Sequence, residues 1–425
     1  MTILVKNLRF LLTILRNKGD NIRVAKAARI HMVLFDKMKN IILLQKENHA
    51  IQRKVTINSP FLFYNSHAER FDGYEVSRIL RFANTVIAKY SAQKLPVLFQ
   101  FGSICLVDKL SYIIFECICY ELMNNYGHPV TLYWEPQNYI RAQGIFSSPL
   151  KLLNTRDVDT KKRFLEKFKY DIYLNHFRKI ISGNEKGDTN YLGILQQDID
   201  VFLKSFFIVE EYRDQIAEVI VELVGNACEH ANTECLLDID ITEDFVKTVG
   251  SIEQEGNYYG INIVILNFSD ILLGDGIKEK IEGEEFSDGR YKNLQDALAY
   301  HKKYFSDNYT YEDFCNISAL QDKISGRKQY INVGGTGLTK LIHSLQEKSD
   351  DDACYVLSGN RIVMFIKQFL NYDSNNWLGF NTSSNFLSAI PDSQVTEQCN
   401  IYFPGTAYNL NFIMKREKEN NGNND

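Results

Sequence analysis

The feature that most constrains the fold is a run in the second half of the chain, where an amphipathic helix leads directly into a strand. The run reads DQIAEVIVELVGNACEHANTECLLDIDI. Ile216, Val219, Ile220 and Leu223 recur at helical spacing and predict a single apolar stripe. The alternating residues LLDIDI predict a strand after it. We therefore expect an α/β fold, in which this helix packs on a sheet.

The same helix carries a second, polar side. Glu222, Asn226 and His230 stand at positions i, i+4 and i+8 and so share one flank of the helix. An amide oxygen at Asn226 suits a Mg²⁺ ion that bridges phosphates, and a carboxylate at Glu222 can orient or deprotonate an attacking group. His230 can belong to this site or can be a helix-end histidine satisfied by backbone groups; the pattern leaves both readings open.

A glycine loop follows about a hundred residues later, in the run NVGGTGLTKLIHSL. Glycines allow backbone N–H groups to approach phosphate oxygens closely. The loop runs straight into a helical pattern, so that a helix N-terminus can face the same anion. The residues that we expect to bind phosphate are Gly334, Gly335, Thr336, Gly337 and Leu338.

Together these two motifs resemble those of the GHKL superfamily, which includes gyrase, heat-shock-90 chaperones and histidine kinases. ELVGNACEHA resembles the N-box, in the form seen in anti-sigma-factor serine kinases, and GGTG resembles the family's second glycine box. The resemblance implies a Bergerat-type α/β sandwich that binds ATP and Mg²⁺. It also implies that Asn226 is the magnesium ligand and Glu222 the catalytic carboxylate.

Two further positions enter through this resemblance. In the family, the strand after the N-box ends in Asp-x-Gly-x-Gly, and the Asp accepts a hydrogen bond from the adenine amine. Here the strand YYGINIVILNF places Asn267 at the Asp position and Ser269 at the first glycine. An Asn oxygen still accepts that bond, without charge assistance. Thr406 matches the threonine that lines the adenine pocket before the last strand.

The N-terminal half predicts a smaller α/β domain. Between residues 55 and 135, strand and helix patterns alternate in an order that favours parallel crossovers. This order resembles the STAS family of anti-sigma-factor antagonists.

We accordingly divide the chain into five segments. They are a basic helical segment at 1–52, a STAS-like domain at 53–140, a helical connector at 141–200, a GHKL domain at 201–416 and a disordered tail at 417–425. CYVLSGNRIVMFI is interpreted as a hairpin around Ser358, Gly359 and Asn360.

Composition narrows the function classes. Over 425 residues the net charge is −5, which gives no reason to expect a nucleic-acid partner, and the 8 scattered cysteines predict reduced thiols in a cytoplasmic protein. No apolar stretch reaches the ~20 residues of a membrane span.

The expected function is an ATPase or protein kinase whose partner is another protein or its own N-terminal half. The alternative is a nucleotide-sensing, non-catalytic interaction protein. Whether the chain forms a homodimer stays open.

Overall fold

The computed structural model describes the greater part of the chain. The described residues are 52–56, 59–102, 104–133, 148–155, 157–182, 190–230, 233–242, 247–249, 252–254, 258–283, 289–322, 324, 337–348 and 354–415. The predicted basic helical segment, apart from Gln52, and the predicted disordered tail lie outside them. Among these residues no helix combines the length and apolar character that crossing a membrane requires.

Helices and strands alternate through the first half of the chain, and long strands dominate the second. The strands are β1 Gln52–Thr56, β2 Ser59–Ser66, β3 Arg70–Phe71, β4 Val97–Phe101, β5 Cys105–Leu106, β6 Val130–Tyr133, β7 Tyr170–Tyr173, β8 His176–Ser182, β9 Glu234–Thr242, β10 Lys247–Val249, β11 Ile252–Gln254, β12 Tyr258–Phe268, β13 Tyr355–Met364 and β14 Thr396–Lys415. The helices are α2 Gly73–Tyr90, α3 Lys109–Asn124, α4 Val158–Lys169, α5 Tyr191–Lys204, α6 Glu210–His230, α7 Asp275–Glu282, α8 Gly289–His301, α9 Tyr311–Ala319 and α10 Gly337–Lys348. Short 3₁₀ turns are η2 Pro149–Asn154, η3 Lys302–Tyr304 and η4 Lys367–Phe369.

The N-terminal half forms a four-stranded sheet in the order β1-β2-β4-β6. β2, β4 and β6 are parallel, which confirms the crossover order predicted for residues 55–135. Two right-handed crossovers that step in the same direction place both of their helices on one face of a sheet. α2 and α3 contact each other accordingly, and they cover the face that carries Leu62, Phe99 and Leu132.

The second half forms a six-stranded antiparallel sheet in the order β13-β14-β12-β9-β8-β7. On one face α6 packs against β8, β9 and β12, flanked by α5 and α10. The apolar stripe of α6, including Ile220, meets Ile239 and Ile263 of the sheet in one core. The predicted amphipathic helix and the strand after it are therefore both present.

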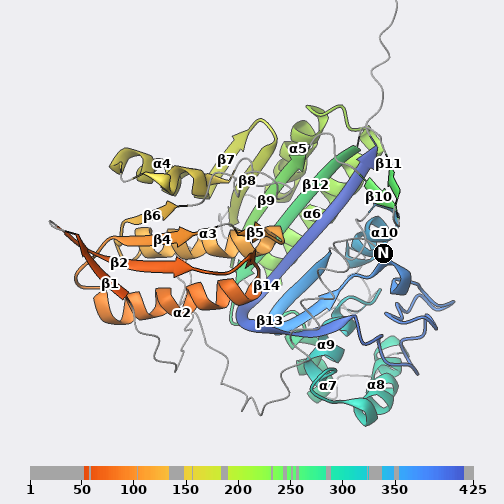
Figure 1. Cartoon of the computed structure of the whole chain (residues 1–425). Helices are drawn as coiled ribbons and strands as arrows, with labels where there is room; N and C mark the ends of the chain where they lie inside the picture. Colours follow the sequence, from red (N-terminus) through yellow and green to blue (C-terminus); the bar gives the residue numbers. More distant parts are fainter. Residues whose placement is uncertain are drawn as a thin grey trace, which may run out of the picture.

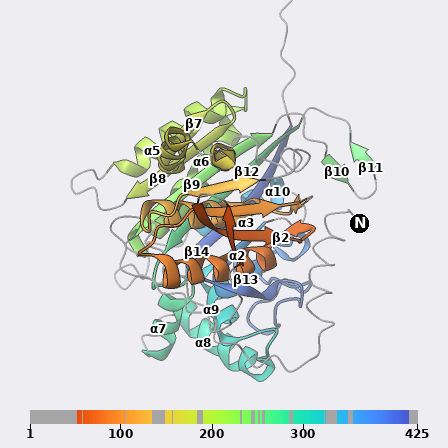
Figure 2. The ribbon, with the colours of Figure 1, turned by 60° about the vertical axis from the view of Figure 1, so that its left-hand side comes forward.

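Helix α3 lies between the two sheets (Figures 1 and 2). The second core of the molecule joins α2 and α3 with apolar side chains of the large sheet, among them Leu236, Val264 and Phe403. The side chains of α3 are buried from Lys109 to Leu122. The two halves thus share one core, and the large sheet is covered on both faces.

The structure differs from the sequence-based prediction in two places. Residues 141–200, predicted as a helical connector, supply α4 and α5 but also β7 and β8, which extend the large sheet. The predicted hairpin around Gly359 is instead one continuous strand, β13, whose register to β14 shifts at Gly359. Gly359 has a φ of +60°, so that the glycine accommodates a bulge and not a chain reversal.

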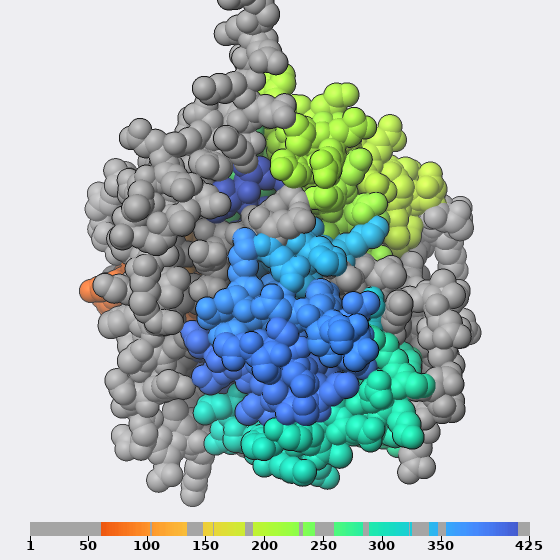
Figure 3. All heavy atoms as spheres, turned by 90° about the vertical axis from the view of Figure 1, so that its right-hand side faces the viewer, coloured from red at the N-terminus to blue at the C-terminus, as the bar shows by residue number. Residues whose placement is uncertain are grey.

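The segment between β12 and α10 contributes the helices α7, α8 and α9. Figure 3 shows their residues, in teal, below the blue residues that follow α10, on the face seen from the right of Figure 1. Arg361 of β13 is tied to α9 through Asp313, with a distance of 2.8 Å from Nε to Oδ1. None of the 8 cysteines forms a disulfide.

Candidate nucleotide site

The expected catalytic pair lies on a half-buried flank of α6. Glu222 and Asn226 are both partly exposed, one helical turn apart. One turn before them, Glu218 accepts a salt bridge of 2.8 Å from Lys340 in the first turns of α10. The beginning of α10, where the glycine loop enters the helix, therefore lies beside the flank of α6 that carries the predicted magnesium ligand.

The two expected base-binding residues are neighbours across the sheet. Asn267 of β12 pairs in register with Thr406 of β14. Because side chains alternate along a strand, Asn267 points to the same face as Ile263 and Ile265, which pack in the core that includes α6. The register thus places two residues that are far apart in the sequence side by side, on the face that α6 covers.

Hydrogen bonds hold both side chains. The Nδ2 of Asn267 donates to the Oγ1 of Thr233 at 3.1 Å, and the hydroxyls of Thr406 and Ser358 lie 3.4 Å apart. Asn267 is only 2% exposed, so a base that contacts it must lie at the bottom of a cavity. With Nδ2 bound to Thr233, Oδ1 is the atom of the amide that can accept a bond from an amine.

Gly405 permits this arrangement. Its φ is +108°, and a Cβ at this position would lie 2.2 Å from the carbonyl oxygen of Asn267. Any side chain here would push β14 away from the end of β12. The glycine that precedes Thr406 is therefore a requirement of the close approach between the two strands.

Thr233 and Ser358 were not expected from the sequence. Thr233 lies just before β9, and Ser358 lies in β13 opposite Thr406. The run ANTECLL gives no sign of a contact with Asn267, because that contact depends on the register in which Cys235 pairs with Asn267. The register emerges only from the assembled sheet.

Several expected residues lie outside the described part of the chain. These are Gly334, Gly335 and Thr336, together with the side chains of His230 and Leu338. Gly337 begins α10, as the loop-into-helix pattern predicts. Among described residues, no hydrogen bond or ion pair joins Glu222 or Asn226 to Asn267 or Thr406.

The opposite face of the large sheet carries a separate polar cluster. His176, Asp238 and Asp240 offer ligand atoms close enough together to hold a metal ion. The ammonium of Lys109, however, lies 2.5 Å from an Asp238 oxygen and 2.7 Å from an Asp240 oxygen. A cation of the protein itself already occupies the position between the two carboxylates, so this cluster is a structural ion-pair network.

Comparisons with models of protein families, with curated proteins and with solved structures find no match to this chain.

Proposed function

We propose that the chain binds ATP with Mg²⁺ in a domain of the GHKL type and hydrolyses it or transfers its phosphate to a protein. In this reading Asn226 is the magnesium ligand and Glu222 positions the attacking group. Asn267 and Thr406 contact the adenine, and the loop from Gly334 to Gly337 surrounds the phosphates. The order α6, β9, β12, α10, β13, β14 agrees with the order that the family resemblance predicts.

The observation that supports the proposal most directly is the register pair of Asn267 and Thr406. The resemblance assigns both residues to the adenine pocket, although they come from distant parts of the sequence. Their adjacency follows from the register of the two strands and is independent of the sequence motifs. It also falls on the face of the sheet where the helix with Glu222 and Asn226 packs.

A second candidate function is that of a nucleotide sensor without turnover. It is favoured by the neutral acceptor at Asn267, where the family has a carboxylate, and by Ser269 in place of the first glycine. Ser269 is 3% exposed, and its hydroxyl accepts from the backbone N–H of Ile271 at 2.9 Å. The serine therefore stabilises one local turn, where the family's glycine would leave the backbone freer.

The N-terminal half is a candidate regulator of the nucleotide site. α3 contacts β12 and β14, and its Lys109 binds Asp238 and Asp240 on β9. Asn267 of the candidate nucleotide site lies on the opposite face of the same sheet, near the end of β12. In the STAS antagonists that this half resembles, a serine near the start of the corresponding helix is phosphorylated. Ser111 near the start of α3 is 6% exposed and bonded to Asp108, which disfavours that reaction here.

Isothermal titration with Mg-ATP tests the proposed function. The full-length chain should bind ATP, and Asn226→Ala should lose the magnesium-dependent part of that binding, because the amide oxygen is a ligand that Mg²⁺ prefers. In EDTA the two proteins should bind alike. Glu211→Ala, an exposed residue in the first turn of the same helix, is the matched control. If Asn226→Ala binds Mg-ATP as tightly as the unchanged protein, the assignment of Asn226 is wrong.

A further inference from the structure

The small sheet has one face that its own crossover helices do not cover. α2 and α3 pack on the face of Leu62, Phe99 and Leu132. By alternation, Phe61, Leu98 and Thr131 point to the opposite face. On that face the sheet and α4 border an open cavity of about 540 Å³, which lies within the usual size of small-molecule sites. None of the described residues that line it belongs to the candidate nucleotide site.

The walls of this cavity are mainly apolar. Phe61, Leu98 and Met123 contribute from the sheet and α3, and Val158 and Leu165 contribute from α4. Val158 is 77% exposed, which is high for a branched apolar side chain beside a concave surface. A ligand with a flexible hydrocarbon chain would cover this surface and remove it from water.

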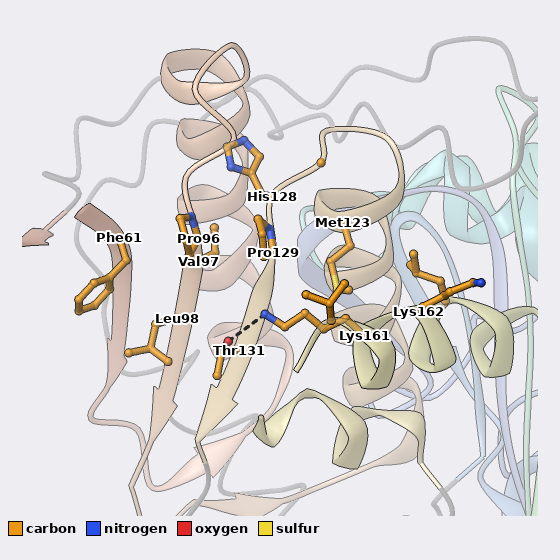
Figure 4. Close-up of a pocket in the computed structure, with 13 residues that line it drawn as sticks. Phe61, Pro96, Val97, Leu98, Met123, His128, Pro129, Thr131, Lys161 and Lys162 are labelled. Carbon is orange, nitrogen blue, oxygen red and sulfur yellow. Dashed lines mark hydrogen bonds between the residues drawn. The ribbon is translucent and has the colours of Figure 1, made fainter. Parts of the chain in front are cut away.

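Among the described residues, the charged side chains that line the cavity are all positive. They are Lys161 and Lys162, and no described aspartate or glutamate lines it. Lys161 reaches from α4 across the sheet face, and its Nζ donates to the hydroxyl of Thr131 at 3.3 Å. Figure 4 shows this ammonium turned toward the sheet, whereas Lys162 points away from Thr131. One ammonium therefore reaches across the groove to the sheet, whereas that of Lys162, which also lines the groove, points away from the sheet residue Thr131.

We propose that this groove binds a single-chain anionic amphiphile of the fatty-carboxylate class. The carboxylate pairs with the ammonium of Lys161, and the hydrocarbon chain lies along Leu98 and Phe61. The concave shape favours a small molecule over a folded partner, and the two lysines of the described lining favour an anionic head group. This site is independent of the proposed nucleotide function.

Calorimetry on the full-length chain with dodecanoate, held below its micellar concentration, tests the proposal. Dodecanoate should bind saturably, and affinity should rise about fourfold for each methylene from octanoate to dodecanoate. Dodecanol and dodecyltrimethylammonium should bind at least about tenfold more weakly, since they lack a charge-assisted bond to Lys161. Binding that ignores chain length or head group would overturn the proposal, as would the absence of binding.

The neighbouring lysines provide a matched pair of variants. Lys161→Met should weaken dodecanoate binding about tenfold or more. Lys162→Met removes the same charge from a lining residue whose ammonium points away from Thr131, and it should weaken binding no more than about threefold. Equal losses would indicate general surface attraction and would overturn the assignment of Lys161. Leu98→Trp, which fills the groove from the sheet side, should abolish binding while circular dichroism and the unfolding midpoint stay near those of the unchanged protein. Full binding by this folded variant would equally refute the site.

Discussion

The ammonium of Lys109 on α3 lies 2.5 Å from a carboxylate oxygen of Asp238 on β9, and both side chains are almost completely buried. The pair belongs to a larger network. Arg178 on β8 joins Asp238 to Glu116 of α3, and the Nε2 of His176 donates to a carboxylate oxygen of Asp238 at 2.9 Å. The contact between the two halves of the molecule therefore combines an apolar core with buried ion pairs.

Removing one partner of this network should destabilise the whole chain. Lys109→Met leaves Asp238 and Asp240 without their shared cation and should cost about 3–5 kcal/mol of unfolding free energy. Urea unfolding measures the loss. The control is Lys340→Met, which breaks the half-exposed pair with Glu218 and should cost less than about 1 kcal/mol. Similar losses for both variants would contradict the role assigned to the buried network.

His176 should make stability depend on pH. Burial lowers its pKa, but Asp238 and Asp240 outweigh that effect and raise the pKa to about 9. The unfolded value is lower, near 6.5, so the folded state binds the proton more tightly. The stabilisation is complete below pH 6.5 and is lost as pH rises through about 9.

Unfolding free energies measured between pH 6 and pH 10 test this linkage. The unchanged protein should lose on the order of 3 kcal/mol across the window. His176→Gln, which keeps a hydrogen-bonding side chain without a titratable ring, should show a much flatter profile. The prediction fails if the two profiles have the same slope.

Gly405 should tolerate no side chain. Gly405→Ala places a Cβ 2.2 Å from the carbonyl of Asn267 at a φ of +108° and should cost at least about 1–3 kcal/mol. ATP binding should weaken as well, because the end of β14 that carries Thr406 must move. Gly73→Ala is the control, since a Cβ there meets nothing within 4 Å. Unchanged stability of Gly405→Ala would mean that the strands separate without cost.

Local patterns predicted the elements around the site well. The helix at Glu210–His230, the two strands β9 and β12, and the parallel order of the small sheet all follow from hydrophobic periodicity and strand–helix alternation. These features depend on residues close together in the chain. The same holds for the start of α10 at Gly337, where a glycine run precedes a helical stripe.

Such local patterns do not predict which strands pair when they are far apart in the sequence. The strands β7 and β8 lie in a charged, mixed segment, and their place at the edge of the large sheet depends on the register of β8 to β9. Gly359 reads as a turn, because a bulge and a hairpin use glycine in the same backbone region. The contact of Thr233 with Asn267 requires the same kind of pairing information.

Asn267→Asp should test the base-binding position. A carboxylate accepts a stronger bond from an amine than an amide does, so ATP binding should tighten or stay the same. The hydroxyl of Thr233 can donate to the new carboxylate in place of accepting from Nδ2. Because the position is buried, the unliganded variant should unfold at a lower temperature, and ATP should raise its midpoint more than in the unchanged protein.

Inosine triphosphate provides the control ligand for this variant. It carries a carbonyl where adenine carries the amine, so Asn267→Asp should not bind it more tightly. Equal gains for both nucleotides would place the base elsewhere. A folded Asn267→Asp protein that no longer binds ATP would also contradict the assignment of Asn267 to the adenine.

Glu222→Ala separates an enzyme from a sensor. If Glu222 positions the attacking group, its removal should leave ATP binding largely intact and slow phosphate release or transfer by about 10²–10⁴-fold. Phosphate release is followed alone and with candidate protein partners. Glu218→Ala, one turn earlier and paired with Lys340, should change the rate only a few-fold, because we assign it no contact with the reacting phosphate.

Turnover that survives in Glu222→Ala would remove this residue from the mechanism. Tight ATP binding without turnover in the unchanged protein would instead select the sensor, since the neutral Asn267 and the constrained Ser269 would then mark a site that holds the nucleotide without reacting.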